Sequence, residues 1–332
     1  MSPKEPPRVI AILGPTASGK TALAIHLAKI LKTQIVSCDS RGIYKGLPSL
    51  TAVPEGRWVK KARTNEIYET NEGIPYHLVD FLDPRERWSA HLFGKAARPL
   101  LKTILSRSPW AIVAGGSGFY WRALSQGFSP APDPDPQLRL RLENRLRQEG
   151  LESLGIELQR RDPAAYERLD AKNPRRVLRA LELCLQLGQP LSLYRKAHPA
   201  CPALPWKFKA FYLNRPAAQI KERISKRIQD SWDKMLGEVR RMETLYGEKT
   251  PHLAAFEALL AEPIWKLQKG RSTPEEAMAD CVRADYQYSK RQRSWFRQEK
   301  DLIPIAPEPN FLQQASEFIL HETGAPAPPV PC

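Results

Sequence analysis

The sequence predicts an α/β protein with a parallel sheet core and a small helical domain inserted into it. Three observations support this fold class. Short apolar runs alternate with helical segments over residues 8–114, a glycine-rich loop follows the first run, and a proline-rich connector then introduces a stretch without strand patterns. Alternating buried strands and helices are typical of a parallel sheet covered by helices on both faces.

The first third of the chain supplies most of the predicted sheet. Helical apolar spacing at residues 21–32 and 90–105 separates short apolar runs that read as buried strands. These runs lie at residues 8–13, 35–38, 77–82 and 110–114.

The middle of the chain predicts the insertion. Residues 129–136, SPAPDPDP, form a stiff polar connector, and residues 137–189 show helical stretches only. Residues 207–213, KFKAFYL, regain β character and are expected to rejoin the sheet. We therefore expect a core of residues 1–128 and 204–320, a helical insertion at 129–203, and a disordered tail at 321–332.

Two basic helical regions follow. Residues 216–246 predict an amphipathic helix or a pair of helices. Residues 273–299 predict another helix, opened by Thr273 as N-cap, Pro274 at the first position and Glu276 three residues after the cap.

Composition restricts the function classes. Lys and Arg total 51 against 36 Asp and Glu, a surplus of +15 that suits a polyanionic partner such as nucleic acid or phosphorylated metabolites. The five scattered cysteines contain no C-x-x-C pair, which argues against a disulfide framework and a zinc finger. No run approaches the roughly 18 apolar residues of a membrane span. We expect a cytoplasmic protein without a membrane partner.

The glycine-rich loop predicts phosphate binding. It matches G-x-x-x-x-G-K-[ST] at every fixed position and lies between a predicted strand and a predicted helix, the context of a P-loop NTPase-like core. Its backbone N–H groups would face phosphate oxygens, while Lys20 supplies a charge and Thr21 a hydroxyl ligand for Mg²⁺. The loop residues are Gly14, Pro15, Thr16, Ala17, Ser18, Gly19, Lys20 and Thr21.

The loop alone does not identify the polyphosphate. An NTPase or kinase would need an acid that holds the metal at the end of a buried strand. Asp39, Asp80 and Asp83 are candidates, but none follows four uninterrupted large apolar residues. A small-molecule P-loop kinase stays open at this point.

Seven segments, read together, resemble the tRNA dimethylallyltransferases (tRNA isopentenyltransferases). They occur in the family's order and extend over nearly the whole chain. The segments are GPTASGKT at 14–21, DSRGIYKGL at 39–47, GIPYHLVDFLDP at 73–84, AGGSGFY at 114–120, NPRRVLRALEL at 173–183, RISKR at 223–227 and KRQRSWFR at 290–297.

The resemblance implies a reaction. A dimethylallyl group would pass from dimethylallyl diphosphate to the exocyclic amine of the adenine 3′ of the anticodon in tRNA, with the adenine flipped into a channel. The implied cofactor is Mg²⁺, and the implied partners are the tRNA anticodon stem-loop and dimethylallyl diphosphate. A monomer is expected.

The resemblance also implies roles for individual residues. Asp39 would be the general base; without the family, a residue that caps the turn after a strand is the better interpretation. Arg227, with Lys20 and Thr21, would stabilise the departing diphosphate. Lys290, Arg293 and Arg297 share one helical face by their spacing. The implied tRNA-binding residues are Asp39, Ser40, Arg41, Gly42, Ser117, Arg175, Arg176, Arg179, Lys290, Arg291, Arg293, Trp295 and Arg297.

Several positions depart from the family pattern. Gly42 stands where the family often has Gln, Leu50 where it has Gly, and Val53 where it has Lys. Residues 261–263, Ala-Glu-Pro, replace a late G-Y-[RK] segment, so that Glu262 would repel RNA phosphates. We expect intact diphosphate chemistry and an altered RNA-binding surface, with different docking or reduced activity.

Three other functions remain open from the sequence. A related adenylate isopentenyltransferase would use a free nucleotide as acceptor, although the basic segments and the insertion argue against it. The others are the small-molecule kinase and a non-catalytic tRNA-binding protein.

Overall fold

The structure is a computed structural model that describes residues 8–61, 64–132, 135–200, 206, 208–258, 260–307 and 310–326. The chain forms two compact units, a core unit of residues 1–125 and 204–332 and a helical unit of residues 126–203. Among the described residues, no helix is long and apolar enough to cross a membrane.

A six-stranded sheet forms the centre of the core unit, in the order β5-β2-β6-β1-β7-β8, and every neighbouring pair is parallel. The predicted α/β class is confirmed. The middle strand, VIAIL, is buried along its whole length because helices cover both faces of the sheet. The strands are β1 (Val9–Leu13), β2 (Ile35–Ser37), β5 (Tyr76–His77), β6 (Ala111–Gly115), β7 (Phe208–Leu213) and β8 (Leu302–Ile305).

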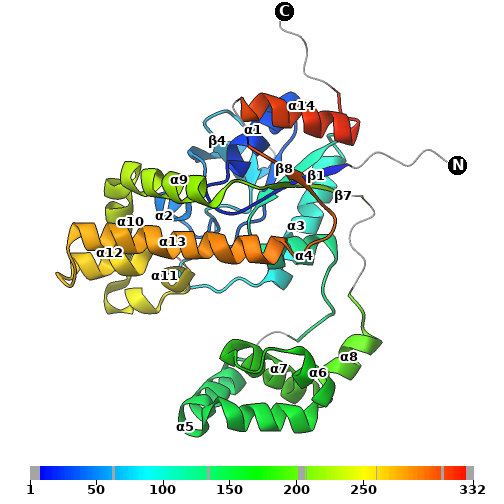
Figure 1. The fold of residues 1–332 in the computed structure, drawn as a ribbon, viewed down its shortest axis with the longest axis vertical. Helices are drawn as coiled ribbons and strands as arrows, with labels where there is room; N and C mark the ends of the chain where they lie inside the picture. The colour runs from blue at the N-terminus through cyan, green and yellow to red at the C-terminus, as the bar shows by residue number, and fades with distance from the viewer. Residues whose placement is uncertain are drawn as a thin grey trace, which may run out of the picture. The chain divides into compact units, whose positions relative to one another are not determined.

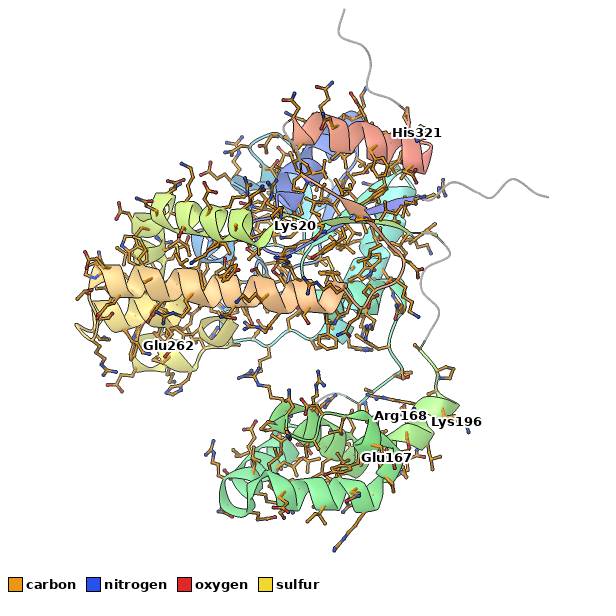
Figure 2. The ribbon with its side chains drawn as sticks, viewed as in Figure 1. Lys20, Glu167, Arg168, Lys196, Glu262 and His321 are labelled. Carbon is orange, nitrogen blue, oxygen red and sulfur yellow. The ribbon has the colours of Figure 1, made fainter. Side chains whose placement is uncertain are left out.

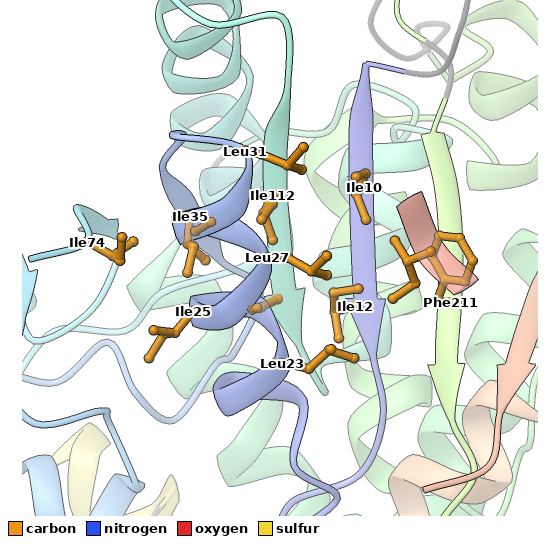
Figure 3. Close-up of a cluster of buried hydrophobic side chains, with 14 of the residues drawn as sticks. Ile10, Ile12, Leu23, Ile25, Leu27, Leu31, Ile35, Ile74, Ile112 and Phe211 are labelled. Carbon is orange, nitrogen blue, oxygen red and sulfur yellow. The ribbon is translucent and has the colours of Figure 1, made fainter. Parts of the chain in front are cut away.

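Helices α1 (Lys20–Ile30) and α14 (Phe311–Thr323) cover one face of this sheet. Figure 3 shows the apolar side of α1 against β1 and β6, where Leu23 and Leu27 meet Ile12 and Ile112. Burial of this apolar surface stabilises the sheet and holds α1 against it, beyond the loop that follows β1.

Helices α3 (Ala90–Leu105) and α4 (Gly118–Ser125) cover the opposite face. Trp121 of α4 packs edge-on against Phe208 with ring centroids 5.4 Å apart. Phe208 and Phe211 are three positions apart in one strand, so their side chains point to opposite faces.

A further group of helices packs around a second apolar cluster in the core unit. The 216–246 region is a helix pair, and α13 begins with the predicted capping box of Thr273 and Glu276. Helix α13 runs beside α9 and α12 (Figure 1). The elements are α2 (Pro48–Thr51), α9 (Ala217–Asp230), α10 (Trp232–Tyr246), η1 (Gly247–His252), α11 (Ala254–Ala258), α12 (Ala261–Gln268) and α13 (Pro274–Phe296).

The helical unit has its own small core. Leu142, Leu154 and Leu158 of the first helix are buried together with Val177 and Leu181 of the third. Its helices are α5 (Pro136–Arg161), α6 (Pro163–Arg168), α7 (Pro174–Leu187) and α8 (Leu191–Ala197).

Two details of the sheet region differ from expectation. The strand expected at residues 77–82 ends at His77, because Leu78 and Asp80 adopt left-handed φ angles of 58° and 51°. An antiparallel hairpin of β3 (Gly56–Lys61) and β4 (Thr64–Thr70) was not predicted; its register shifts between Val59 and Lys61, which weakens the period-two pattern.

The expectation of a disordered tail at residues 321–332 is wrong for its first three residues, which are helical. Helix α14 continues through Thr323 because Ile319 and Leu320 are buried in the core cluster. Residues 327–332 lie outside the described residues.

Candidate active site

A cavity of about 250 Å³ lies where β1, β2 and β6 end, the edge at which parallel sheets commonly bind ligands. Its wall has a polar part and an apolar part. The polar part contains Thr16, Lys20, Thr21, Asp39, Arg223 and Arg227, and the apolar part contains Ala52, Val53, Pro54, Tyr76 and Val79. Figure 2 shows Lys20 near the middle of the core unit.

The glycine-rich loop of residues 14–21, called the phosphate loop from here on, connects β1 to α1 and has the geometry of an anion site. Gly19 adopts a φ of 101°, which favours glycine, and it has no side chain to cap the N–H groups of α1. Those groups are therefore available to an anion. Lys20 is buried and donates from Nζ to the carbonyl oxygen of Pro15 at 3.2 Å. Burial lowers the pKa of Lys20.

Three arginines contact the outer side of this loop. Arg227 donates from Nη1 to Thr16 Oγ1 at 3.1 Å. Arg223 donates to the carbonyl oxygen of Ala17 at 2.8 Å, and Arg215 to that of Ser18 at 3.0 Å. Arg227 was predicted from the sequence as a diphosphate-binding residue, whereas Arg223 and Arg215 were not. Arg223 precedes Arg227 by four positions, so helical spacing was the available signal.

Asp39 follows β2 and belongs to the cavity wall. Its Oδ1 accepts the N–H of Arg41 at 2.9 Å, the turn-capping contact of a residue at a strand end. Ser117 Oγ accepts the N–H of Ser40 at 2.8 Å and donates to Ser40 Oγ at 2.9 Å. The structure thus brings Asp39, Ser40, Arg41 and Ser117 together.

The other two acids considered for the metal contact different groups. Asp80 accepts from the N–H of Gly46 at 2.6 Å and from Trp58 Nε1 at 2.9 Å. Asp83 pairs with Arg85, whose guanidinium lowers the pKa of that carboxyl to about 2. Of the three candidates, Asp39 is the one in the cavity wall.

Through Gln292, helix α13 joins the phosphate loop to the loop that follows β6. Its amide oxygen accepts the N–H of Thr16 at 2.8 Å, and its Nε2 donates to the carbonyl oxygen of Gly116 at 2.9 Å. A Cβ at Gly116 would lie 2.3 Å from that Nε2, so a glycine is required there. Gln292 was not predicted as a site residue, although it lies within the KRQRSWFR segment.

Asp285 lies about two turns before Gln292 on the same face of α13, and it too was not predicted as a site residue. Its side chain is 2% exposed. It accepts from Arg41 Nη1 at 2.9 Å and from Arg227 Nη2 at 2.5 Å. A buried carboxylate flanked by two guanidinium groups is well compensated for its burial.

The predicted basic residues of α13 lie mostly at the surface. Lys290, Arg291 and Arg297 are exposed, and Arg293 is half-buried. Lys290 Nζ lies 4.8 Å from the centroid of the Tyr286 ring, in a groove between α9 and α13. These side chains are absent from the described cavity wall around Asp39.

Trp295 has a packing role. A Cβ at Gly118 would lie 2.0 Å from its ring, and Arg122 Cζ lies 4.9 Å from the ring centroid. Among the helical-unit residues, Arg175 and Arg176 are exposed at the start of α7, while Arg179 pairs with the buried Glu182 at 3.0 Å.

The departures from the family pattern fall in different places. A Cβ at Gly42 would lie 3.2 Å from Val53 Cγ2, so these two departures face each other in the cavity wall. Leu50 is buried in the second apolar cluster, and its N–H donates to the buried Glu238 at 2.9 Å. Glu262 is exposed on α12 (Figure 2) and pairs with Lys266 at 2.8 Å, which reduces the expected repulsion of phosphate.

A magnesium ion fits the oxygen donors of this cavity. No cluster of three or more His, Cys, Asp or Glu side chains with metal-binding geometry occurs among the described residues. Mg²⁺ needs no such cluster, since it commonly takes one or two protein oxygens together with substrate phosphates. The hydroxyl of Thr21, which is hydrogen-bonded to Tyr76, and the carboxylate of Asp39 are oxygens in the cavity wall.

The parallel sheet, with a glycine-rich loop between β1 and α1 and a carboxylate in the cavity wall beside it, defines a protein of the P-loop NTPase-like fold class. The family model for IPP transferase matches residues 43–299. A tRNA dimethylallyltransferase of Xanthomonas axonopodis pv. citri (strain 306) is 34% identical over 93% of this chain and 92% of its own length.

Solved structures agree. The tRNA isopentenylpyrophosphate transferase of Bacillus halodurans is 26% identical with a TM-score of 0.63, over 96% of this chain and 97% of that one. A eukaryotic dimethylallyltransferase acting on tRNA has the same fold, with 20% identity, a TM-score of 0.75, and coverage of 96% and 80%. The chain belongs to the IPP transferase family, and the resemblance read from its sequence segments is confirmed.

Proposed function

We propose that this protein transfers a dimethylallyl group from dimethylallyl diphosphate to the exocyclic amine of the adenine 3′ of the anticodon in tRNA. The observation that carries the proposal is the cavity of about 250 Å³ that joins the phosphate loop, an apolar wall and Asp39. A substrate with a diphosphate head and a short hydrocarbon chain matches the two parts of that wall.

Asp39 is the proposed general base. The exocyclic amine of adenine is a poor nucleophile because its lone pair is shared with the ring. As the amine nitrogen bonds to the first carbon of the dimethylallyl group, the carbon–oxygen bond to the diphosphate breaks. The amine proton passes to the Asp39 carboxylate, so nucleophilicity rises as the new bond forms.

The phosphate loop and its arginines are the proposed diphosphate site. Negative charge grows on the diphosphate as it leaves, and donors fixed before the reaction stabilise that charge best. Lys20, Arg223 and Arg227 would face it together with loop N–H groups. Thr21 would hold Mg²⁺, which supplies further positive charge to the leaving group.

On the acceptor side, we propose that the anticodon stem-loop approaches the loop of Asp39, Ser40 and Arg41, with Ser117 beside it. The surplus of +15 suits RNA phosphates. Donor and acceptor groups belong to one core unit, which supports action as a monomer. Action on tRNA would take place in the cytoplasm.

Transfer of label from dimethylallyl diphosphate tests the proposal. The protein is incubated with the labelled donor and Mg²⁺, and with tRNA, with AMP, or without an acceptor. We expect label in tRNA, at the adenosine 3′ of the anticodon. Labelled AMP without labelled tRNA would favour the adenylate isopentenyltransferase, and ATP turnover without label transfer would favour a kinase. Binding of tRNA without any transfer would mean a non-catalytic protein.

A further inference from the structure

Asp285 connects two arginines that belong to different halves of the site. Its Oδ2 accepts from Arg227 Nη2 at 2.5 Å, and its Oδ1 accepts from Arg41 Nη1 at 2.9 Å. The carboxylate is 2% exposed, whereas the two guanidinium side chains are 27% and 16% exposed. One buried anion therefore holds two cations that both extend toward solvent.

Arg227 leads from Asp285 to the phosphate loop. The same guanidinium that donates to Asp285 also donates from Nη1 to Thr16 Oγ1 at 3.1 Å, and it belongs to the cavity wall. A diphosphate in this loop would meet Arg227 directly. The position of the Arg227 guanidinium in turn depends on the Asp285 carboxylate.

Arg41 leads from Asp285 to the proposed base. Its N–H donates to Asp39 Oδ1 at 2.9 Å, and its guanidinium carbon lies 3.5 Å from the centroid of the Tyr288 ring. Tyr288 is hydrogen-bonded to Ser40 and Ser117, and burial raises its pKa to about 12. The conformation of the Asp39–Arg41 loop is thus tied to the Arg41 side chain.

We propose that Asp285 is a positioning residue that couples binding of the diphosphate to binding of the RNA acceptor. A diphosphate fixes Arg227, the shared carboxylate transmits this order to Arg41, and Arg41 fixes the loop that carries Asp39. Two guanidinium groups without the anion between them would repel each other and leave both loops less ordered. The proposal rests on the proposed function.

Coupling of this kind is reciprocal. If a bound diphosphate tightens RNA binding by a given factor, bound RNA tightens diphosphate binding by the same factor. Inorganic pyrophosphate is a suitable probe because it occupies the phosphate loop without transferring a group.

The experiment measures the dissociation constant of an unmodified anticodon stem-loop RNA with and without saturating pyrophosphate and Mg²⁺. In the wild type we expect pyrophosphate to tighten RNA binding roughly five- to fiftyfold, within the usual range of such coupling. In Asp285→Asn the factor should fall below about two. Asp280→Asn is the matched control, since Asp280 lies on the same helix in an exposed pair with Arg283 and should leave the factor unchanged.

A second variant avoids the buried position. Arg41→Ala removes a side chain whose contacts in the described part of the chain, to Asp285 and Tyr288, lie outside the phosphate loop, yet it frees Asp285 on one side. We expect it to weaken pyrophosphate binding several-fold, and it should also remove the coupling. Asp285→Glu should restore part of the coupling, because it keeps the charge.

The outcomes separate this inference from the proposed function. Unchanged coupling in a folded Asp285→Asn, or unchanged pyrophosphate affinity in Arg41→Ala if Asp285→Asn does not fold, overturns the role of Asp285. A wild type that binds both probes independently also overturns it, while the proposed function stands. A wild type that binds neither probe contradicts the proposed function itself.

Discussion

Helix α13 has two faces that differ in burial and in the contacts they make. On the inner face, Asp285 and Gln292 are 2% and 4% exposed and hold groups of the phosphate loop and the Asp39 loop. On the outer face, Lys290, Arg291 and Arg297 are exposed cations. One side of the helix therefore contacts the loops of the cavity through a neutral amide and a carboxylate, and the other side carries positive charge at the surface.

The difference shows why charge alone is a poor guide to the site. Buried polar groups must find partners within the protein, so Asp285 and Gln292 each have defined hydrogen bonds. Exposed cations keep their hydration and exchange partners freely, which suits contact with RNA phosphates. Substitutions on the two faces should therefore differ in which ligand they affect.

Asp39→Asn should have the largest effect, because it removes the proposed base from the loop that the inner face of α13 contacts through Arg41. We expect turnover to fall by roughly 10²–10⁴, the usual contribution of a general base, with donor binding nearly unchanged. Single-turnover label transfer to tRNA measures the rate, and a pyrophosphate titration measures the binding. Wild-type turnover in Asp39→Asn would mean that this residue only caps its turn.

Lys20→Ala and Thr21→Ala should give the next largest effect, on the donor alone. Loss of one contact to a charged oxygen should weaken binding of dimethylallyl diphosphate roughly ten- to hundredfold. Thr21→Ala should also raise the Mg²⁺ concentration needed for half-maximal activity. Titrations of donor and metal measure both effects. ATP should compete poorly with dimethylallyl diphosphate. Binding of ATP that is tighter than binding of the donor, together with ATP hydrolysis, would contradict the proposed transferase activity.

The triple variant Lys290→Ala, Arg293→Ala, Arg297→Ala tests two exposed cations of the outer face together with the half-buried Arg293 beside them. Each lost phosphate contact removes about one released counterion, so tRNA binding should weaken and its log–log salt slope should flatten by about two to three units. Binding isotherms at several salt concentrations measure this. An unchanged affinity and slope would show that this face is not the tRNA surface.

Glu262→Arg should have the smallest effect. Removal of a like charge should tighten tRNA binding, but Glu262 already pairs with Lys266 and is exposed, so a change of about two- to threefold is expected. The same salt series measures it, with wild type as reference. If neither this variant nor the triple variant changes binding, the RNA docks by another route.

The sequence predicted the features that depend on neighbouring residues. The phosphate loop between β1 and α1, the capping box of α13 and the return of β7 to the sheet all follow from local patterns. The strand end at His77 did not, since a left-handed residue such as Leu78 is set by its surroundings.

The missed site residues depend on contacts between distant parts of the chain. Asp285 meets Arg41 across 244 positions, and Gln292 meets Thr16 across 276. In the sequence, each resembles an ordinary polar residue of an exposed helix face. Only the packing of α13 against the two loops shows that they are buried.

The separation of the two faces of α13 is tested most directly by comparing Gln292→Ala with the triple variant in one buffer. Pyrophosphate and anticodon stem-loop RNA are each titrated into both proteins. We predict that Gln292→Ala weakens pyrophosphate binding roughly five- to tenfold, since it removes a hydrogen bond that fixes the phosphate loop, with a smaller effect on RNA. The triple variant should weaken RNA binding and leave pyrophosphate binding unchanged. Equal losses of both ligands in both variants would contradict the account.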